Sequence, residues 1–130
     1  MHEAAPRIQV DPFVATRDRE RWLVTWRLSN FGHEPLRLVS ALQPHSEFRT
    51  DETPLVGSIP AGGSTDVTLP VRFRKPPGEV VENPFLIIRV AARAGRWNVL
   101  ARVRITAGQH GEPLAASDVI VTVNPADTGG

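Results

Sequence analysis

The chain has 130 residues, of which 41% are hydrophobic and 22% are charged, and its formal net charge at pH 7 is +1. This composition excludes a disordered chain, and the length predicts one folded domain over residues 1–130. The absence of cysteine excludes disulfides, thiolate metal sites and cysteine nucleophiles, while the near-neutral charge makes nucleic acid an unlikely general partner.

The first six residues contain neither the basic segment nor the apolar segment of a signal peptide. No apolar run approaches the ~20 residues that a membrane-spanning helix needs. We therefore expect a cytoplasmic protein without membrane insertion. Residues 1–6 and 125–130 are expected to be flexible tails.

Hydrophobic residues alternate with polar ones along most of the chain, which is typical of β-strands and not of helices. In residues 21–29, the apolar face holds Trp22, Val24, Trp26 and Leu28. The other strands expected before the hairpin described below cover residues 7–14, 36–42, 47–49, 55–56 and 65–74.

Charged and turn-forming segments separate these strands. Residues 16–20, 30–35, 60–64, 75–84 and 107–116 are expected to be loops or turns. In the strand at 36–42, the residues Leu36, Leu38 and Leu42 are expected on one face. A last strand is expected at 118–123, with Val119, Val121 and Val123 pointing inward.

Residues 85–93 and 96–106 give the clearest hairpin pattern, with Ala94 and Gly95 placed at a two-residue turn. That turn predicts four apolar pairs on the inner face. The pairs are Ala92/Trp97, Val90/Val99, Ile88/Ala101 and Leu86/Val103. A slip of one residue would destroy this division into faces, so the alternation constrains the register.

Seven or eight short strands, with turns every ~8–12 residues, predict an all-β immunoglobulin-like antiparallel β-sandwich. The run WRLSNFGHEPLRL at residues 26–38 resembles a turn and strand of the ASH-type and major-sperm-protein-like domains. The run IPAGGSTDV at residues 59–67 is similar to a later turn of those domains. The resemblance covers about residues 20–75, and it implies an immunoglobulin-like fold that acts as a non-catalytic binding module or spacer.

The sequence contains no recognisable catalytic or metal-binding motif. The four histidines do not have the spacing of metal ligands, and the residues around Ser64 lack the second glycine of a nucleophile elbow. Three tryptophans could form a sugar-binding platform, but each shares its face with core residues, so core packing is the better interpretation. We therefore expect no enzyme, no cofactor and no metal.

The hairpin at residues 85–106 has an unusual outer face, because it combines large apolar side chains with arginine and carries no acidic residue. This composition is typical of the centre of a protein interface. The residues expected on this face are Phe85, Ile87, Arg89, Leu100, Arg102 and Arg104. Two alternatives explain this face without a binding partner. Loop acids such as Glu79 and Glu82 could pair with the arginines, or residues 107–117 could cover the apolar side chains.

Three functions follow from these patterns. The first is a protein-interaction or structural module that binds a protein partner, or a second copy of itself, through the outer face of the hairpin. The second is an anion or nucleic-acid binder that uses the same arginines, and it requires affinity that falls steeply with salt. The third is an enzyme, which requires a cleft with converging titratable groups.

Overall fold

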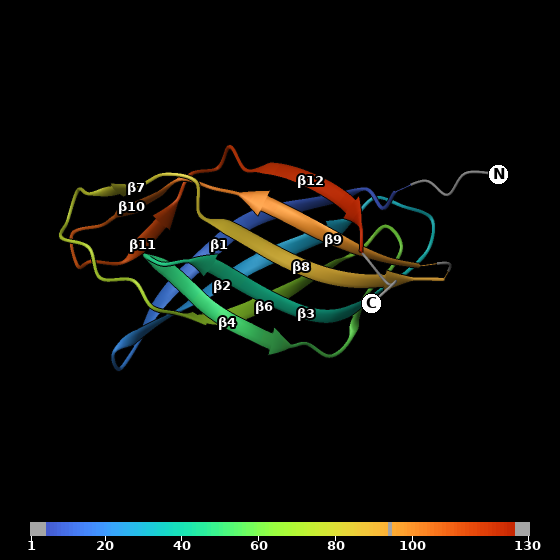
Figure 1. Cartoon of the computed structure of the whole chain (residues 1–130), viewed down its shortest axis with the longest axis horizontal. Coiled ribbons are helices and arrows are strands. Elements are labelled where there is room, and N and C mark those ends of the chain that lie inside the picture. Colours follow the sequence, from blue (N-terminus) through green and yellow to red (C-terminus); the bar gives the residue numbers. More distant parts are fainter. Residues whose placement is uncertain (1–4, 94, 127–130) are drawn as a thin grey trace.

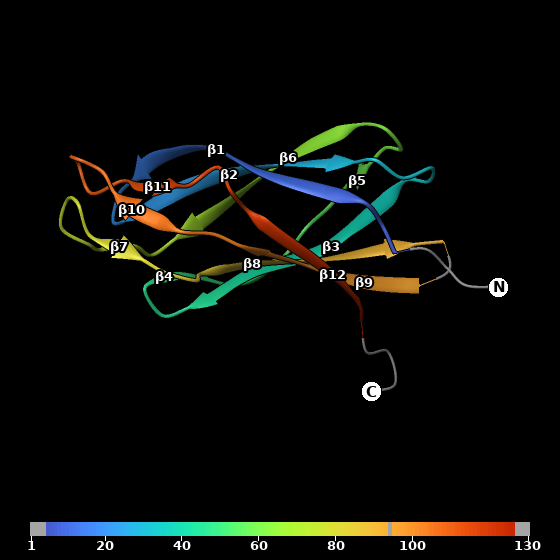
Figure 2. The same ribbon diagram turned by 90° about the horizontal axis from the view of Figure 1, so that it is seen from above.

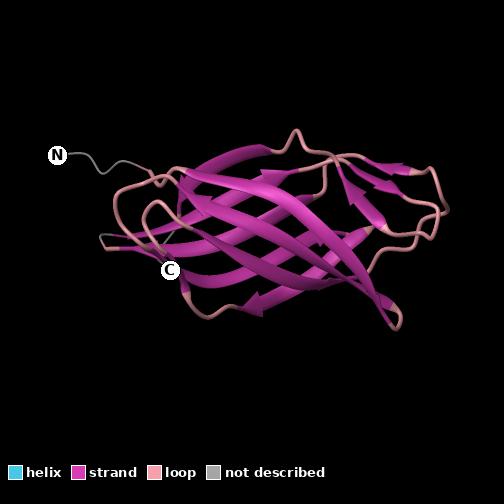
Figure 3. Cartoon of the chain, turned by 180° about the vertical axis from the view of Figure 1, so that it is seen from behind, coloured by secondary structure: helices cyan, strands magenta, loops and turns pink. Residues whose placement is uncertain are grey.

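The structure is a computed structural model that describes residues 5–93 and 95–126, and the regular elements in this part of the chain are β-strands. Figure 3 shows strands and loops throughout. The strands are β1 (Ile8–Asp18), β2 (Arg21–Asn30), β3 (Leu36–His45), β4 (Phe48–Pro54), β5 (Ser58–Ile59), β6 (Ser64–Val71), β7 (Val80–Val81), β8 (Phe85–Ala92), β9 (Gly95–Arg102), β10 (Ile105–Ala107), β11 (Pro113–Ala115) and β12 (Ile120–Pro125).

The strands form three antiparallel sheets, labelled in Figure 1. The first sheet has the order β1-β2-β6, and the largest has the order β12-β9-β8-β3-β4, with β5 also paired to β3. A small third sheet has the order β11-β10-β7. Figure 2 shows that the first sheet and the largest sheet face each other as two layers.

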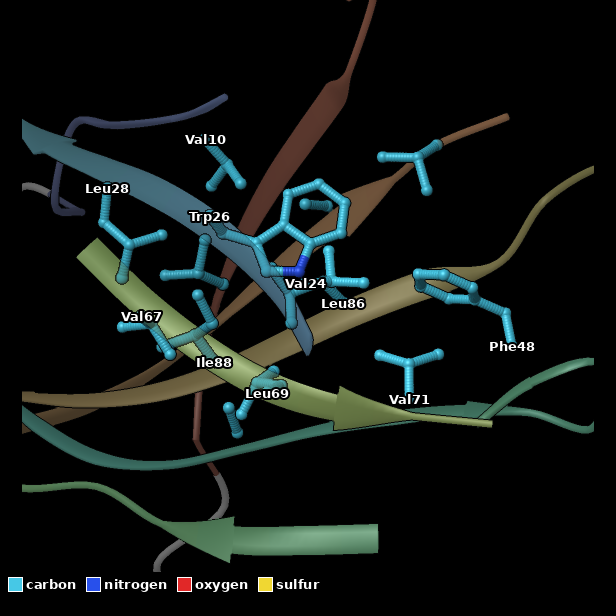
Figure 4. Packing of buried hydrophobic residues seen from close by; sticks show 14 of the residues in the cluster. Val10, Val24, Trp26, Leu28, Phe48, Val67, Leu69, Val71, Leu86 and Ile88 are labelled. Atoms are coloured by element: carbon cyan, nitrogen blue, oxygen red, sulfur yellow. The ribbon is translucent and has the colours of Figure 1, made fainter. Parts of the chain in front are cut away.

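The hydrophobic core lies between these two layers. As predicted, Trp22, Val24, Trp26 and Leu28 of β2 are all buried, because the residues between them point to the opposite face. Leu86 and Ile88 of β8 approach from the other layer (Figure 4), and both are buried, as is Val90. The third tryptophan, Trp97, is half-buried and packs against this core.

The prediction of seven or eight strands was too low, since the described residues alone form twelve. The first expected loop, at residues 16–20, largely belongs to a long β1–β2 hairpin whose last pair is Asp18↔Arg21. Arg19 has a φ of 57° there, so the chain reverses within two residues. The expected strand at 55–56 was wrong: β4 continues to Pro54, and the next pairing with β3 is made at Ser58–Ile59.

The prediction that Leu42 shares a face with Leu36 and Leu38 was also wrong. The pairing of β3 with β8 runs Leu38↔Val90 and then Ser40↔Arg89, so Val39 is an extra residue in β3. This β-bulge reverses the alternation of the residues that follow it. Leu36 and Leu38 are therefore buried as predicted, whereas Leu42 lies opposite Ile87 on the outer face.

The hairpin formed by β8 and β9 exists, but its register differs by two residues from the prediction. The observed pairs are Leu86↔Ala101, Ile88↔Val99, Val90↔Trp97 and Ala92↔Gly95. Because a shift of two keeps each side chain on the same face, the predicted division into inner and outer residues survives. The connection falls one position earlier than expected, and Ala94 itself lies outside the described residues.

The second strand of the hairpin is shorter than predicted, because β9 ends at Arg102. Residues 105–107 instead pair with β7 and β11, which arise from segments that were expected to be loops. At the C-terminal side, Asn124 and Pro125 belong to β12 and not to a tail. The predicted flexible ends otherwise fall partly on residues 1–4 and 127–130, outside the described residues.

A backbone bridge joins the two layers at one corner. Arg49, in β4, donates its N–H to the carbonyl oxygen of Arg72 at 3.2 Å, and Arg72 donates to the carbonyl oxygen of Arg49 at 3.0 Å. The described part of the chain contains no helix of the length and hydrophobicity required to cross a lipid bilayer.

Candidate interaction face

The outer face of the largest sheet carries an apolar row across three strands. Ile87 in β8 pairs directly with Leu100 in β9 on one side and with Leu42 in β3 on the other. All three side chains are half-buried. In Figure 2, no described strand packs on this side of the layer.

Phe85 and Arg102 form the next pair along the same face. The Arg102 guanidinium carbon lies 5.7 Å from the centre of the Phe85 ring, in a cation–π contact. No acidic side chain of the described residues pairs with Arg102, and the same holds for Arg37 and Arg96 at the other end of the face. Arg102 thus lies next to the apolar row, whereas Arg37 and Arg96 lie on its other side, beyond Arg89.

Arg89, by contrast, is part of a satisfied polar cluster. Its Nε donates to Glu52 Oε2 at 2.9 Å, and its Nη1 donates to Asn98 Oδ1 at 3.2 Å. The Ser40 hydroxyl donates to the same Glu52 oxygen at 2.7 Å. The Ser40 hydroxyl and then the Arg89 guanidinium stabilise the carboxylate, so the pKa of Glu52 is lowered.

Arg104 follows the end of β9, and its Nε pairs with Glu82 Oε1 at 2.9 Å. The alternative in which loop acids pair with the hairpin arginines is therefore confirmed for Arg104 and Glu82. Residues 107–117 contribute to the third sheet, at the end of the molecule marked by β10 and β11 in Figure 1.

Five of the six predicted residues lie on the outer face of the β8–β9 pair, and two residues from other strands join them there. Phe85, Ile87, Arg89, Leu100 and Arg102 share the outer face of the β8–β9 pair. Leu42 was missed because a bulge leaves no mark in the period-two pattern. Glu52 was missed because it lies two strands away from Arg89, beyond β3.

The outer face of the other layer has a different character. Side-chain hydrogen bonds join three cross-strand pairs between β2 and β6. The bonded pairs are Thr25 with Thr68 at 2.8 Å, Arg27 with Asp66 at 2.9 Å and Ser29 with Ser64 at 2.9 Å. The hydrogen bond and charge of Arg27 lower the pKa of Asp66. The β2–β6 part of this face is therefore polar and hydrogen-bonded, while Val14 of β1, paired with Thr25, is an exposed apolar side chain on it.

A hollow of about 590 Å³ lies at one end of the molecule, beside the β2–β3 turn. Its apolar lining includes Leu36, Ala92 and Trp97, and the exposed side chains of His33 and Glu34 stand at its rim. The described residues contain no group of three or more histidine or acidic side chains that could hold a metal ion.

Comparison with known proteins adds no name to these observations. No protein-family model matches the chain, and neither the curated proteins nor the solved structures contain a match. Function must therefore be argued from the faces and contacts of this chain.

Proposed function

We propose that this chain is a non-catalytic protein-interaction module that binds a partner through the outer face of β8, β9 and β3. The contrast between the two outer faces supports this proposal most strongly. The face of β2 and β6 has its polar groups paired, whereas the opposite face presents Leu42, Ile87 and Leu100 in a row. Apolar side chains flanked by arginine are typical of interface centres.

The charge of this face supports a partner with acidic groups around an apolar contact. Arg37, Arg96 and Arg102 are unpaired at its two ends, so stacking two copies face to face would bring like charges together. A second copy of the chain therefore fits this surface less well than a different protein does.

Nucleic acid is the less supported alternative. The apolar row between the arginines offers nothing to phosphate groups, and the Phe85 ring is already in contact with Arg102. Base stacking needs an aromatic ring with a free face. A protein partner would contact both the apolar row and the arginines of this face.

The two facing layers and the turns at residues 26–38 and 59–67 support an immunoglobulin-like sandwich of the kind that the sequence resembles.

The non-catalytic part of the proposal rests on the end hollow. Its rim presents His33 and Glu34 as exposed neighbours on one turn, without the converging, buried titratable groups that catalysis requires.

Affinity capture with variants of the face tests the proposal. The wild-type chain, Arg102→Glu and Ile87→Asp are used as baits in an extract of the source cells, with Arg93→Glu as a charge-matched control. Arg93 is exposed beyond the apolar row. We expect a protein that wild type and Arg93→Glu retain and that both face variants lose. Equal retention by all four baits, or retention by none, would contradict the proposal.

A further inference from the structure

Three arginines lie side by side where the two layers join. Arg49 and Arg72 exchange both of their backbone hydrogen bonds, so they are directly opposite each other on β4 and on the residue that follows β6. The register of β2 and β6 ends with Trp22↔Val71. Continued by one residue, it sets Arg21 beside Arg72, which completes a row across three strands.

The three side chains point to the outside of the joint. Their chain neighbours Trp22, Thr50 and Val71 are buried, and alternate residues of a strand point to opposite faces. Arg21, Arg49 and Arg72 are all exposed. We call these three residues the arginine row.

The arginine row has more positive charges than acidic partners. Like charges on directly opposite strand positions destabilise a sheet. Arg49 Nε pairs with Asp51 Oδ1 at 3.1 Å, but neither Arg21 nor Arg72 has an acidic partner among the described residues. The row with Asp51 therefore carries a formal charge of +2.

The arginine row also surrounds a small pocket of about 160 Å³. A water molecule occupies ~30 Å³, so the pocket has room for about five water molecules. The remaining lining residues are Thr50, Asp51, Thr53 and Pro70. Thr50 Oγ1 donates to the Pro70 carbonyl oxygen at 2.7 Å, and Thr53 Oγ1 donates to the Asp51 carbonyl oxygen at 2.8 Å. The guanidinium groups are thus the donors left for a ligand.

We propose that the arginine row binds a phosphate group, either as free phosphate or as a phosphomonoester. Such a group is small enough to fit in the pocket, and its charge of about −1.5 to −2 at pH 7 matches the formal charge of +2 on the row with Asp51. Guanidinium groups grip phosphate oxygens through paired N–H donors. The bound anion would also remove the repulsion between Arg21 and Arg72. This site is separate from the outer face of β8 and β9.

Calorimetric titration tests the site. Wild type, Arg72→Gln and the control Arg93→Gln are titrated with inorganic phosphate and with O-phosphoserine at constant ionic strength, and chloride serves as the reference anion. We expect wild type and Arg93→Gln to bind with equal affinity. Arg72→Gln should bind at least about tenfold more weakly, because a charge-assisted contact is lost.

The two titrants separate the sources of the ligand: tighter binding of O-phosphoserine indicates a phosphorylated molecule, and tighter binding of phosphate indicates the free ion. Thermal unfolding in chloride checks that Arg72→Gln is folded; Arg21→Gln replaces it otherwise. Wild type that binds neither titrant, or Arg72→Gln that binds as well as wild type, would overturn the proposal. Partner capture by the β8–β9 face is unaffected by either result.

Discussion

Trp26 shows how a single residue anchors the core. Its side chain is fully buried between the layers (Figure 4), yet its indole N–H has no hydrogen-bond partner among the described residues. An unpaired buried donor costs about 1–3 kcal/mol. The free energy gained by burying the ring must exceed that cost, because many core side chains pack around it.

Replacing Trp26 with alanine should therefore destabilise the fold by roughly 3–5 kcal/mol, the range for loss of a large buried aromatic side chain. Urea unfolding of the two proteins measures the difference. Trp26→Phe is the control, since it keeps part of the volume and removes the unpaired donor, and its loss should be smaller. A loss below about 1 kcal/mol for Trp26→Ala would mean that the ring does not fill the core.

Glu52 gives the residue-scale prediction for pH. The Ser40 hydroxyl and the Arg89 guanidinium lower its pKa from the ordinary 4.5. A carboxyl group whose pKa is lower in the folded state stabilises the fold above its unfolded pKa, and this contribution is lost as the pH falls through the folded value. Wild type should thus exceed Glu52→Gln in stability at neutral pH.

That difference should shrink at about pH 3, because the unfolded chain is protonated below the ordinary 4.5 and the contribution of the folded carboxylate is lost as the pH falls toward its lowered pKa. Urea unfolding at the two pH values makes the comparison, and Glu34→Gln is the matched control on an exposed turn. A difference that stays constant between the two pH values would show that Glu52 makes no charge-dependent contribution through Ser40 and Arg89.

At the scale of elements, the β-bulge at Val39 decides which leucines of β3 belong to the core. Leu38, before the bulge, is buried, and Leu42, after it, is half-buried on the outer face. Leu38→Ala should cost about 2–5 kcal/mol, as for other buried leucines, whereas Leu42→Ala should cost less than about 1 kcal/mol.

Chemical denaturation of these two variants tests the bulge directly, because the same substitution is made at both positions. Equal losses would place both side chains in one environment and contradict the reversal of faces. Ile87→Ala, opposite Leu42, should resemble Leu42→Ala.

The β-bulge in β3 also shows which parts of the fold can be predicted from the sequence and which cannot. Alternation placed Trp22 to Leu28 and the two faces of the β8–β9 hairpin correctly, because any even register preserves the faces. The prediction from alternation failed after Val39, since an inserted residue moves the following side chains to the opposite face without changing the composition of the strand. It also failed for β7, β10 and β11, whose two or three residues are too short to show a period.

The candidate face was predictable to the same extent. Ile87 and Leu100 followed from alternation within one hairpin, which is local information. The Arg89–Glu52 ion pair and the arginine row each combine strands distant in sequence, so they depend on the order of strands in the sheets. No local pattern specifies that order.

For the whole molecule, the two layers differ in the chemistry that they present to solvent. One layer shows the paired polar residues of β2 and β6, and the other shows the apolar row with unpaired arginines at its ends. Self-association through the second layer would oppose Arg102 and Arg37 of each copy to arginines of the other. Repulsion between like charges is strongest at low ionic strength.

Light scattering after size-exclusion chromatography, at low and at high salt, distinguishes a different partner from a second copy. We expect wild type to have the mass of one chain at low salt, and Arg102→Glu to have the same mass. A wild-type dimer that persists at high salt and is lost in Ile87→Asp would instead assign the apolar row to self-association. A dimer already present at low salt, where the repulsion between the arginines is strongest, would mean that burial of Leu42, Ile87 and Leu100 outweighs this repulsion.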